Sequence, residues 1–243
     1  MWWSNLFSNM SPASFFNFSF LPKYGPYFLK GIGYTLLLAV VSVLLAVVPA
    51  LLLAIMRLSK NRLVKSLSGA YIAVFRSTPL LVQLSIIYFG LFGAITIPRI
   101  TILGFVDISR FIPGVVALAL NSSAYVAEIF RGGILAVDIG QTEASRSLGL
   151  SAWSTMKLVV LPQAIKNVLP ALANEIVTMV KESSICSMLG MVELMFAAKT
   201  VASTTYISLG PYVVAAVIYF AINYPASKAI EAIERRMRRG DKQ

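Results

Sequence analysis

Long apolar runs, separated by short segments rich in basic residues, constrain this chain more than any other feature. Several runs are about 20 residues long, which as an α-helix is enough to cross a hydrocarbon layer roughly 30 Å thick. Charged residues make up only 13% of the sequence, against the ~25% of an ordinary soluble domain, and the mean hydropathy is +0.78. The sequence therefore predicts an all-α, polytopic membrane protein.

Five transmembrane helices account for the apolar runs. We expect them at residues 27–56, 78–97, 111–132, 163–196 and 211–233. The fourth is the least apolar, because it contains four polar or charged residues: Asn174, Glu175, Lys181 and Glu182. These bounds give an N-terminal extracytoplasmic or interfacial segment (1–26), a transmembrane domain (27–233) with a cytoplasmic loop at 140–163, and a basic tail (234–243).

The basic residues predict which way the spans run. They concentrate after the first and third spans and in the tail: Arg57, Lys60, Arg62, Lys65, Arg131, Arg146, Lys157, Lys166, Arg235, Arg236, Arg238 and Arg239. The opposite connections hold only Arg99, Arg110 and Lys199, with Lys23 and Lys30 before the first span. Because basic loops stay on the cytoplasmic side, we expect the N-terminus outside and the tail inside, beside anionic membrane lipid.

Composition also excludes several function classes. The net charge of +11 comes from residues that flank the apolar spans, so it reflects topology and gives no reason to expect nucleic-acid binding. With no histidine and only Cys186, the chain lacks the ligands of a metal cluster, an intrachain disulfide and the base of a Ser-His-Asp triad. An intramembrane enzyme would need a serine activated by Lys181, and it is the least supported interpretation.

The segment from Glu143 to Pro162, EASRSLGLSAWSTMKLVVLP, is too polar to span a membrane and too regular for a linker. Gln141 and Thr142 offer N-caps for a short helix beginning at Glu143, whose charge suits a helix N-terminus. Gly149 is suited to the C′ position that ends this helix.

A second short helix follows in the same segment. Ser151 can cap it, and it is expected to run to Leu161, where Pro162 forces a change of direction. Trp153, Met156 and Val160 share one helical face, so this face is apolar and needs a partner. The partner is either another protein or the rest of this chain.

This segment resembles the EAA loop of ABC-transporter permeases, in which Glu-Ala-Ala is followed by three residues, Gly, nine residues and Ile-x-Leu-Pro. Five positions match in register: Glu143, Ala144, Gly149, Leu161 and Pro162. Ser145 replaces the second Ala, and Val159 replaces Ile. The resemblance implies that the matching residues and Ser145 couple the chain to an ATPase, because the EAA loop inserts into a groove on that subunit.

Three further segments resemble the histidine/glutamine type of polar amino acid permease: FRSTPLLVQL (75–84), NSSAYVAEIFRGGI (121–134) and NEIVTMVKESS (174–184). The resemblance implies a type I ABC importer permease fold in a bacterial cytoplasmic (inner) membrane. It also implies three kinds of partner: an ABC ATPase, a second permease copy or a homologous permease, and an extracytoplasmic amino acid-binding protein.

The chain has no G-x-x-x-x-G-K-[ST] phosphate-binding loop. We therefore expect ATP and Mg²⁺ to bind to the partner ATPase, and we expect no cofactor and no enzyme activity in this chain. Energy must then arrive through a mechanical contact with the cytoplasmic loop.

Polar side chains inside the spans are candidates for lining the substrate path, since charges within a membrane usually face a bundle interior. The candidates are Gln83 in the second span, Asn121, Tyr125 and Glu128 in the third, and Glu175, Thr178, Lys181 and Glu182 in the fourth. The alternative is that they fasten the helices together without touching substrate.

Two other functions remain open at this point. An ion-driven secondary transporter would need no EAA loop and would move substrate without an ATPase. A membrane scaffold that docks an ATPase would assemble with it but give no flux. The sequence leaves open which amino acid is carried and whether the permease pairs with itself or with a related chain.

Overall fold

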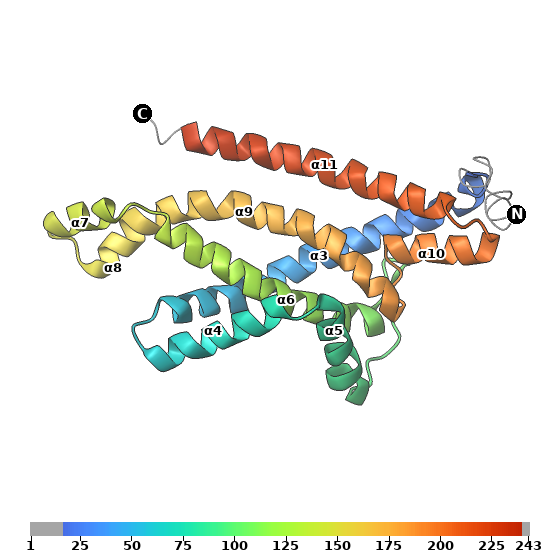
Figure 1. Cartoon of the computed structure of the whole chain (residues 1–243), viewed down its shortest axis with the longest axis horizontal. Helices are drawn as coiled ribbons and strands as arrows, with labels where there is room; N and C mark the ends of the chain where they lie inside the picture. The colour runs from blue at the N-terminus through green and yellow to red at the C-terminus, as the bar shows by residue number, and fades with distance from the viewer. Residues whose placement is uncertain (1–16, 240–243) are drawn as a thin grey trace, which may run out of the picture.

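The computed structural model describes residues 17–239, and it is an elongated bundle of helices (Figure 1). Four helices are long and apolar enough to cross a membrane. They are α3 (Leu21–Leu58), α6 (Ile108–Leu135), the continuous helix Ala152–Leu189 that contains α9 (Leu161–Glu182), and α11 (Gly210–Arg239), whose part Gly210–Met237 is the span. The predicted all-α membrane fold is therefore confirmed, and most of the predicted residues 1–26 lie outside the described part.

The second predicted span, residues 78–97, corresponds to a slightly shorter helix, Leu80–Ala94, which follows another helix after a sharp bend. The structure has α4 (Arg62–Ser77), then α5 (Leu80–Ser85), a π-helix η1 (Ile86–Leu91) and a short 3-10 helix η2 (Phe92–Ala94), with a bend of 106° between the two parts. The bend lies at Thr78 and Pro79. A residue before proline is pushed into extended backbone, and Thr78 has ψ 148°. Counting this bent pair as one span gives five.

A short antiparallel hairpin leads from this bent pair into α6. Its strands are β1 (Thr101–Ile102) and β2 (Val106–Asp107), with Thr101 opposite Asp107 and Ile102 opposite Val106. Asp107 then caps α6, because its side chain accepts a hydrogen bond from the Ser109 N–H at 3.0 Å.

Small side chains bring α3 and α6 close together. Ala39, Ala46, Ala50 and Ala54 on α3 are fully buried, and so are Ala117, Ala124 and Ala127 on α6. Apolar side chains give little drive for association inside a membrane, so helices there depend on such close backbone approach. This contact is the centre of the bundle, and α9 packs against both helices.

The fourth span also differs from the predicted residues 163–196. It begins at α8 (Ala152–Thr155), passes through a π-helix η3 (Met156–Val160) and α9, and ends in a 3-10 helix η4 (Ser183–Leu189). Gly190, with φ +74°, terminates it. Glu193 then caps a separate helix, α10 (Leu194–Thr205), which the apolar pattern did not separate from the span.

The two ends of the bundle carry different elements (Figure 1). The α7–α8 hairpin, the connection between α3 and α4 and the end of α11 lie at one end, while the start of α3 and α10 lie at the other. The first of these ends is the one where most basic residues of the described chain lie. This arrangement agrees with the charge distribution from which the topology was predicted.

Candidate functional site

The α7–α8 hairpin begins earlier than the sequence suggested. α7 runs over Ile139–Ser147, and its N-cap is Asp138, whose Oδ1 accepts a hydrogen bond from the Gly140 N–H at 2.6 Å. The predicted start at Glu143, with Gln141 or Thr142 as the cap, is therefore wrong. The carboxylate of Asp138 caps a helix as well as the side chains of Gln141 or Thr142 would, and Asp138 lies about one turn earlier in the chain.

The predicted end of α7 at Gly149 is confirmed. Gly149 has φ +87°, which is the left-handed conformation that favours glycine. Its N–H donates to the Arg146 carbonyl at 3.0 Å, and the Leu150 N–H donates to the Ser145 carbonyl at 3.2 Å. These two bonds form a Schellman motif, which satisfies carbonyls at the end of the helix.

The predicted cap of the second helix is confirmed, but the predicted turn at Pro162 is wrong. Ser151 Oγ accepts a hydrogen bond from the Ser154 N–H at 3.1 Å and so caps α8. The helix then continues through Pro162 into α9. The Leu161 N–H bonds to the Met156 carbonyl, one residue further back than in an α-helix, and this wider π turn accommodates a proline that would otherwise clash with the preceding turn.

Several large apolar side chains of this hairpin are exposed to solvent. Leu148 is 84% exposed and Trp153 is 73% exposed, and Ile139 and Leu158 are similarly open. Of the three predicted apolar positions, Trp153 and Met156 are exposed, whereas Val160 packs inside the chain. The described part of the chain therefore leaves most of the hairpin's apolar surface uncovered.

The residues expected to contact an ATPase divide between the surface and the interior of the hairpin. The exposed ones are Glu143, Ala144, Gly149, Leu161 and Pro162. Ser145 is buried, and its Oγ lies 3.2 Å from Oγ1 of Thr155, which is also buried. Nothing in the sequence pattern marked Thr155, because a lone hydroxyl residue in a helix carries no signal of what it faces.

Gln83 and Asn121, two candidates for the substrate path, are buried against each other. Asn121 Nδ2 donates to Gln83 Oε1 at 2.8 Å. Gln83 Nε2 in turn donates to the carbonyl oxygens of Phe75 and Thr78, at 2.8 and 3.0 Å, and lies 2.7 Å from Thr78 Oγ1. These oxygens lie at the break between α4 and α5, so the pair satisfies polar groups that the break exposes.

Tyr125 and Glu128 lie further along α6, towards the hairpin end. The guanidinium of Arg76 lies over the Tyr125 ring, 5.3 Å from its centre. Glu128 Oε2 accepts hydrogen bonds from Arg131 at 2.6 and 2.9 Å, and its Oε1 lies 3.7 Å from Nε of Arg57. Two arginines on different helices thus meet one carboxylate, which joins the end of α3 to α6.

The four candidates on α9 form a row along that helix. Glu175 accepts a hydrogen bond from Ser122 of α6 at 2.8 Å. Thr178 and Glu182 are half-buried, and Lys181 is exposed. The structure therefore does not gather all eight candidates around one cavity. Gln83, Asn121, Glu128 and Glu175 have partners within the chain, whereas Lys181 is exposed.

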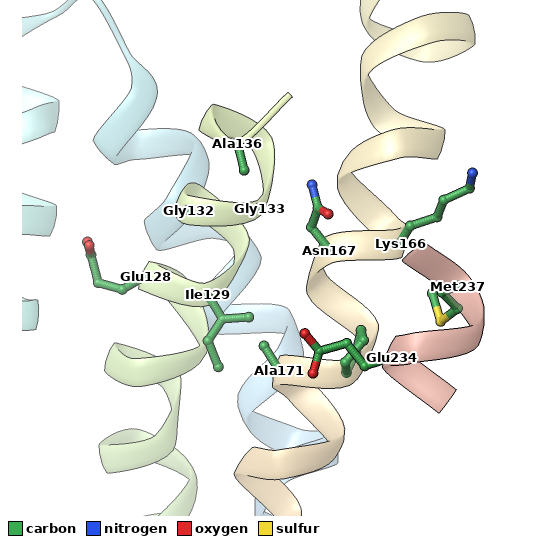
Figure 2. Close-up of a pocket in the computed structure, with 11 residues that line it drawn as sticks. Glu128, Ile129, Gly132, Gly133, Ala136, Lys166, Asn167, Ala171, Glu234 and Met237 are labelled. Carbon is green, nitrogen blue, oxygen red and sulfur yellow. The ribbon is translucent and has the colours of Figure 1, made fainter. Parts of the chain in front are cut away.

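A hollow of about 290 Å³ lies near the hairpin end, between α6, α9 and α11 (Figure 2). Its lining includes Ile129 of α6, Ala136 directly after α6, Asn167 of α9 and Glu234 of α11. Figure 2 shows Glu128 directed away from α9. The adjacent Gly133 allows α6 to approach α9 here, because a Cβ at that position would overlap Cγ2 of Val168.

A match to a protein family agrees with the long apolar helices of the structure. Residues 42–239 match the family described as "Binding-protein-dependent transport system inner membrane component". The chain belongs to this family. It is therefore a multi-pass membrane component of a transport system, in accord with its long apolar helices.

Similar proteins cover nearly the whole chain. The putative glutamine transport system permease protein GlnP of Rickettsia felis is 41% identical over 90% of this chain and 98% of its own length. The arginine transport system permease protein ArtQ of Bacillus subtilis is 39% identical over 89% and 94%. Among solved structures, an amino acid ABC transporter crystallised with histidines has a chain that is 44% identical over 90% of this one and 98% of its own, with a TM-score of 0.81.

Proposed function

We propose that this chain is the permease subunit of an ATP-binding-cassette importer for polar amino acids. It forms the path across the bilayer, and a separate ATPase subunit supplies the energy. The family of the chain supports this function, and so do its relatives, which are named as glutamine and arginine transport system permeases. The 44% identical chain of an amino acid ABC transporter supports the same substrate class.

The observation that carries the proposal is the bare apolar surface of the α7–α8 hairpin. Leu148 and Trp153 are largely exposed at an end of the bundle rich in basic residues, which the positive-inside rule places in the cytoplasm. A protein groove is the natural cover for such a surface. The ATPase is the partner that fits, because the hairpin continues directly into the span-forming helix Ala152–Leu189.

The proposal assigns the other components to separate chains. ATP and Mg²⁺ bind to the ATPase, and this subunit carries no cofactor of its own. A second permease, either another copy or a homologous chain, completes the pore, and an extracytoplasmic binding protein delivers the amino acid. The hairpin and the C-terminus face the cytoplasm, and the N-terminus faces outside, as the positive-inside rule requires.

The row of polar residues on α9 is the part of the substrate path that the structure favours. Glu175, Thr178, Lys181 and Glu182 lie along one stretch of a span, and both signs of charge are present for a zwitterionic amino acid. Tyr125 under Arg76 remains a candidate near the hairpin end. The contacts of Gln83, Asn121 and Glu128 within the chain hold the helices together, so these residues need no contact with substrate to explain them.

Reconstitution tests the function directly. The permease is placed in liposomes with its ATPase and binding protein, and uptake of labelled glutamine and arginine is followed with ATP inside. We expect uptake that depends on ATP and stops when the phosphate-binding lysine of the ATPase is replaced. Uptake by the permease alone, driven by an ion gradient, would identify a secondary transporter. Assembly with the ATPase but no flux of any amino acid would identify a scaffold.

A further inference from the structure

The α7–α8 hairpin has a mechanical weak point between its two helices. Helix α7 connects to α8 through a turn of four residues that contains Gly149. From α8 onwards the chain is one helix as far as Leu189. A force applied to α7 would therefore be absorbed by the turn unless α7 is fixed to the long helix by other contacts.

Side-chain contacts across the hairpin provide this fixation. Ser145 Oγ of α7 donates to the Thr142 carbonyl of its own helix at 2.9 Å and lies 3.2 Å from Thr155 Oγ1 of α8. Ser145 and Thr155 are both at most 5% exposed. At the outer edge, Gln163 Nε2 of α9 donates to Gln141 Oε1 of α7 at 3.4 Å. The same Nε2 donates to the Val159 carbonyl at 3.0 Å, so Gln163 joins α7 to the π turn.

The Ser145–Thr155 contact is the stronger of the two, because it is shielded from water. If this contact breaks, Ser145 keeps the Thr142 carbonyl, but the buried Thr155 hydroxyl loses its partner, which costs free energy. An exposed amide exchanges its partner for water at little cost. The resembled EAA pattern has alanine where this chain has Ser145. The substitution therefore adds a hydroxyl at the one position of α7 where the structure provides a buried hydroxyl opposite.

We propose that Ser145 and Thr155 form a latch that makes α7 move with the long helix, and that Gln163 supports it. The latch rests on the proposed function, since its role is to carry movement of the ATPase from the hairpin into α9. Ser145 and Thr155 are positioning residues: Thr155 is too buried to touch a partner, and it acts through the orientation of α7.

The test compares variants of the assembled transporter in liposomes. Thr155→Val keeps the volume of the side chain and removes its hydroxyl, and Thr155→Ser keeps the hydroxyl. Ser145→Ala removes the contact from the other side, together with the bond to the Thr142 carbonyl within α7, and the double variant Ser145→Ala/Thr155→Val removes both hydroxyls. Ser154→Ala is the matched control, because that hydroxyl bonds only to Ser151 within the same helix turn. Both uptake and ATP hydrolysis are measured, together with assembly.

We expect Thr155→Val to lower the amount of amino acid moved per ATP hydrolysed by about threefold to tenfold, which is the range of one hydrogen bond. Assembly should be retained. The double variant should be no worse than the single ones, since both remove the same contact. Thr155→Ser and Ser154→Ala should match the wild type.

Two results would overturn the latch while leaving the transport function in place. One is a wild-type ratio of uptake to hydrolysis in Thr155→Val and in the double variant. The other is loss of assembly in both Thr155→Val and Thr155→Ser, which would assign Thr155 to packing. If the wild-type complex showed no ATP-driven uptake at all, the proposed function would fail, and the latch with it.

Discussion

The side-chain amides of Gln83 and Asn121 meet at 2.8 Å inside the bundle, 38 residues apart in the sequence. Their contact explains how a membrane span can break by 106° without exposing its backbone. Gln83 satisfies the Phe75 and Thr78 carbonyls, and Thr78 Oγ1 satisfies the Val74 carbonyl at 2.8 Å. In lipid each of these oxygens would otherwise be costly to bury.

The first prediction concerns this pair. Gln83→Leu keeps a similar volume but removes the Gln83 bonds to the Phe75 and Thr78 carbonyls and to Asn121, and leaves Asn121 and the Phe75 carbonyl with only their long contact of 3.5 Å. We therefore expect the free energy of unfolding to fall by about 2–3 kcal/mol. Thermal unfolding of the purified chain in detergent measures the change. Asn174→Ala is the control, since Asn174 lies exposed on α9. Equal melting temperatures for Gln83→Leu and the wild type would contradict the role of the pair.

Two neighbouring glycines on α6 give a second prediction. Gly133→Ala places a methyl group onto Cγ2 of Val168, and we expect it to destabilise the bundle by about 1–3 kcal/mol. Gly132→Ala is the matched control, because a Cβ there meets no atom within 4 Å and should stabilise the helix by about 0.5–1 kcal/mol. Adding Val168→Ala to Gly133→Ala should recover part of the loss. Thermal unfolding distinguishes the three variants.

A third prediction concerns the turn of the hairpin. Gly149→Asp introduces a side chain at φ +87°, a strain of about 1–2 kcal/mol for most residues, and a charge on the docking surface. We expect weaker binding of the ATPase and lower uptake. Gly149→Asn should retain more of both, because asparagine is similar in size to aspartate and adopts this conformation but adds no charge. Unchanged ATPase association and uptake in Gly149→Asp would exclude the turn from coupling.

The fourth prediction tests the row on α9. Glu182 is half-buried in the span next to the exposed Lys181. If it lines the substrate path, Glu182→Gln should reduce uptake of cationic amino acids by at least about tenfold, the equivalent of one lost charged contact. Assembly and ATP hydrolysis should be unchanged. Wild-type uptake of every amino acid tested would remove Glu182 from the path.

The fifth prediction is a pH dependence of stability at the other end of the bundle. Glu193, in the connection between the last two spans, is fully buried. Burial raises the pKa of its carboxyl group from the ordinary 4.5 to about 7, although the N–H groups of Met195 and Phe196 lower it. The folded chain therefore holds this proton more tightly than the unfolded chain. The resulting stability is fully present below about pH 4.5 and is lost as the pH rises through about 7.

Two other groups act on this carboxyl. Tyr219 of α11 donates a hydrogen bond to it at 2.9 Å, and Lys199 of α10 lowers its pKa electrostatically. Glu193→Gln removes the titrating group and keeps its size. We expect the melting temperature of the wild type to rise relative to this variant between about pH 8 and pH 5. Parallel melting curves across that range would refute the assignment.

Several features of this protein followed from the sequence because they depend on local chemistry. The cost of burying charge in lipid separates apolar spans from basic loops, which made the membrane fold and the approximate position of α6 predictable. The start of α3 at Leu21 lies six residues before the predicted one. The conformation of Gly149 was predictable too, since an αL residue that ends a helix is most often glycine. The EAA pattern marked the hairpin that projects from the bundle.

The tertiary structure decided what each polar side chain faces. The sequence left open whether Gln83 and Asn121 line a substrate path or fasten helices, and the fold places them at a backbone break. It also places Thr155 opposite Ser145. Pro79 bends its span, whereas Pro162 is accommodated by a π turn. The location of a polar residue inside an apolar span determines the free-energy cost of burying it. The hydrogen-bond partners that offset this cost come from residues far along the chain, so only the packing of the helices determines which partners they are.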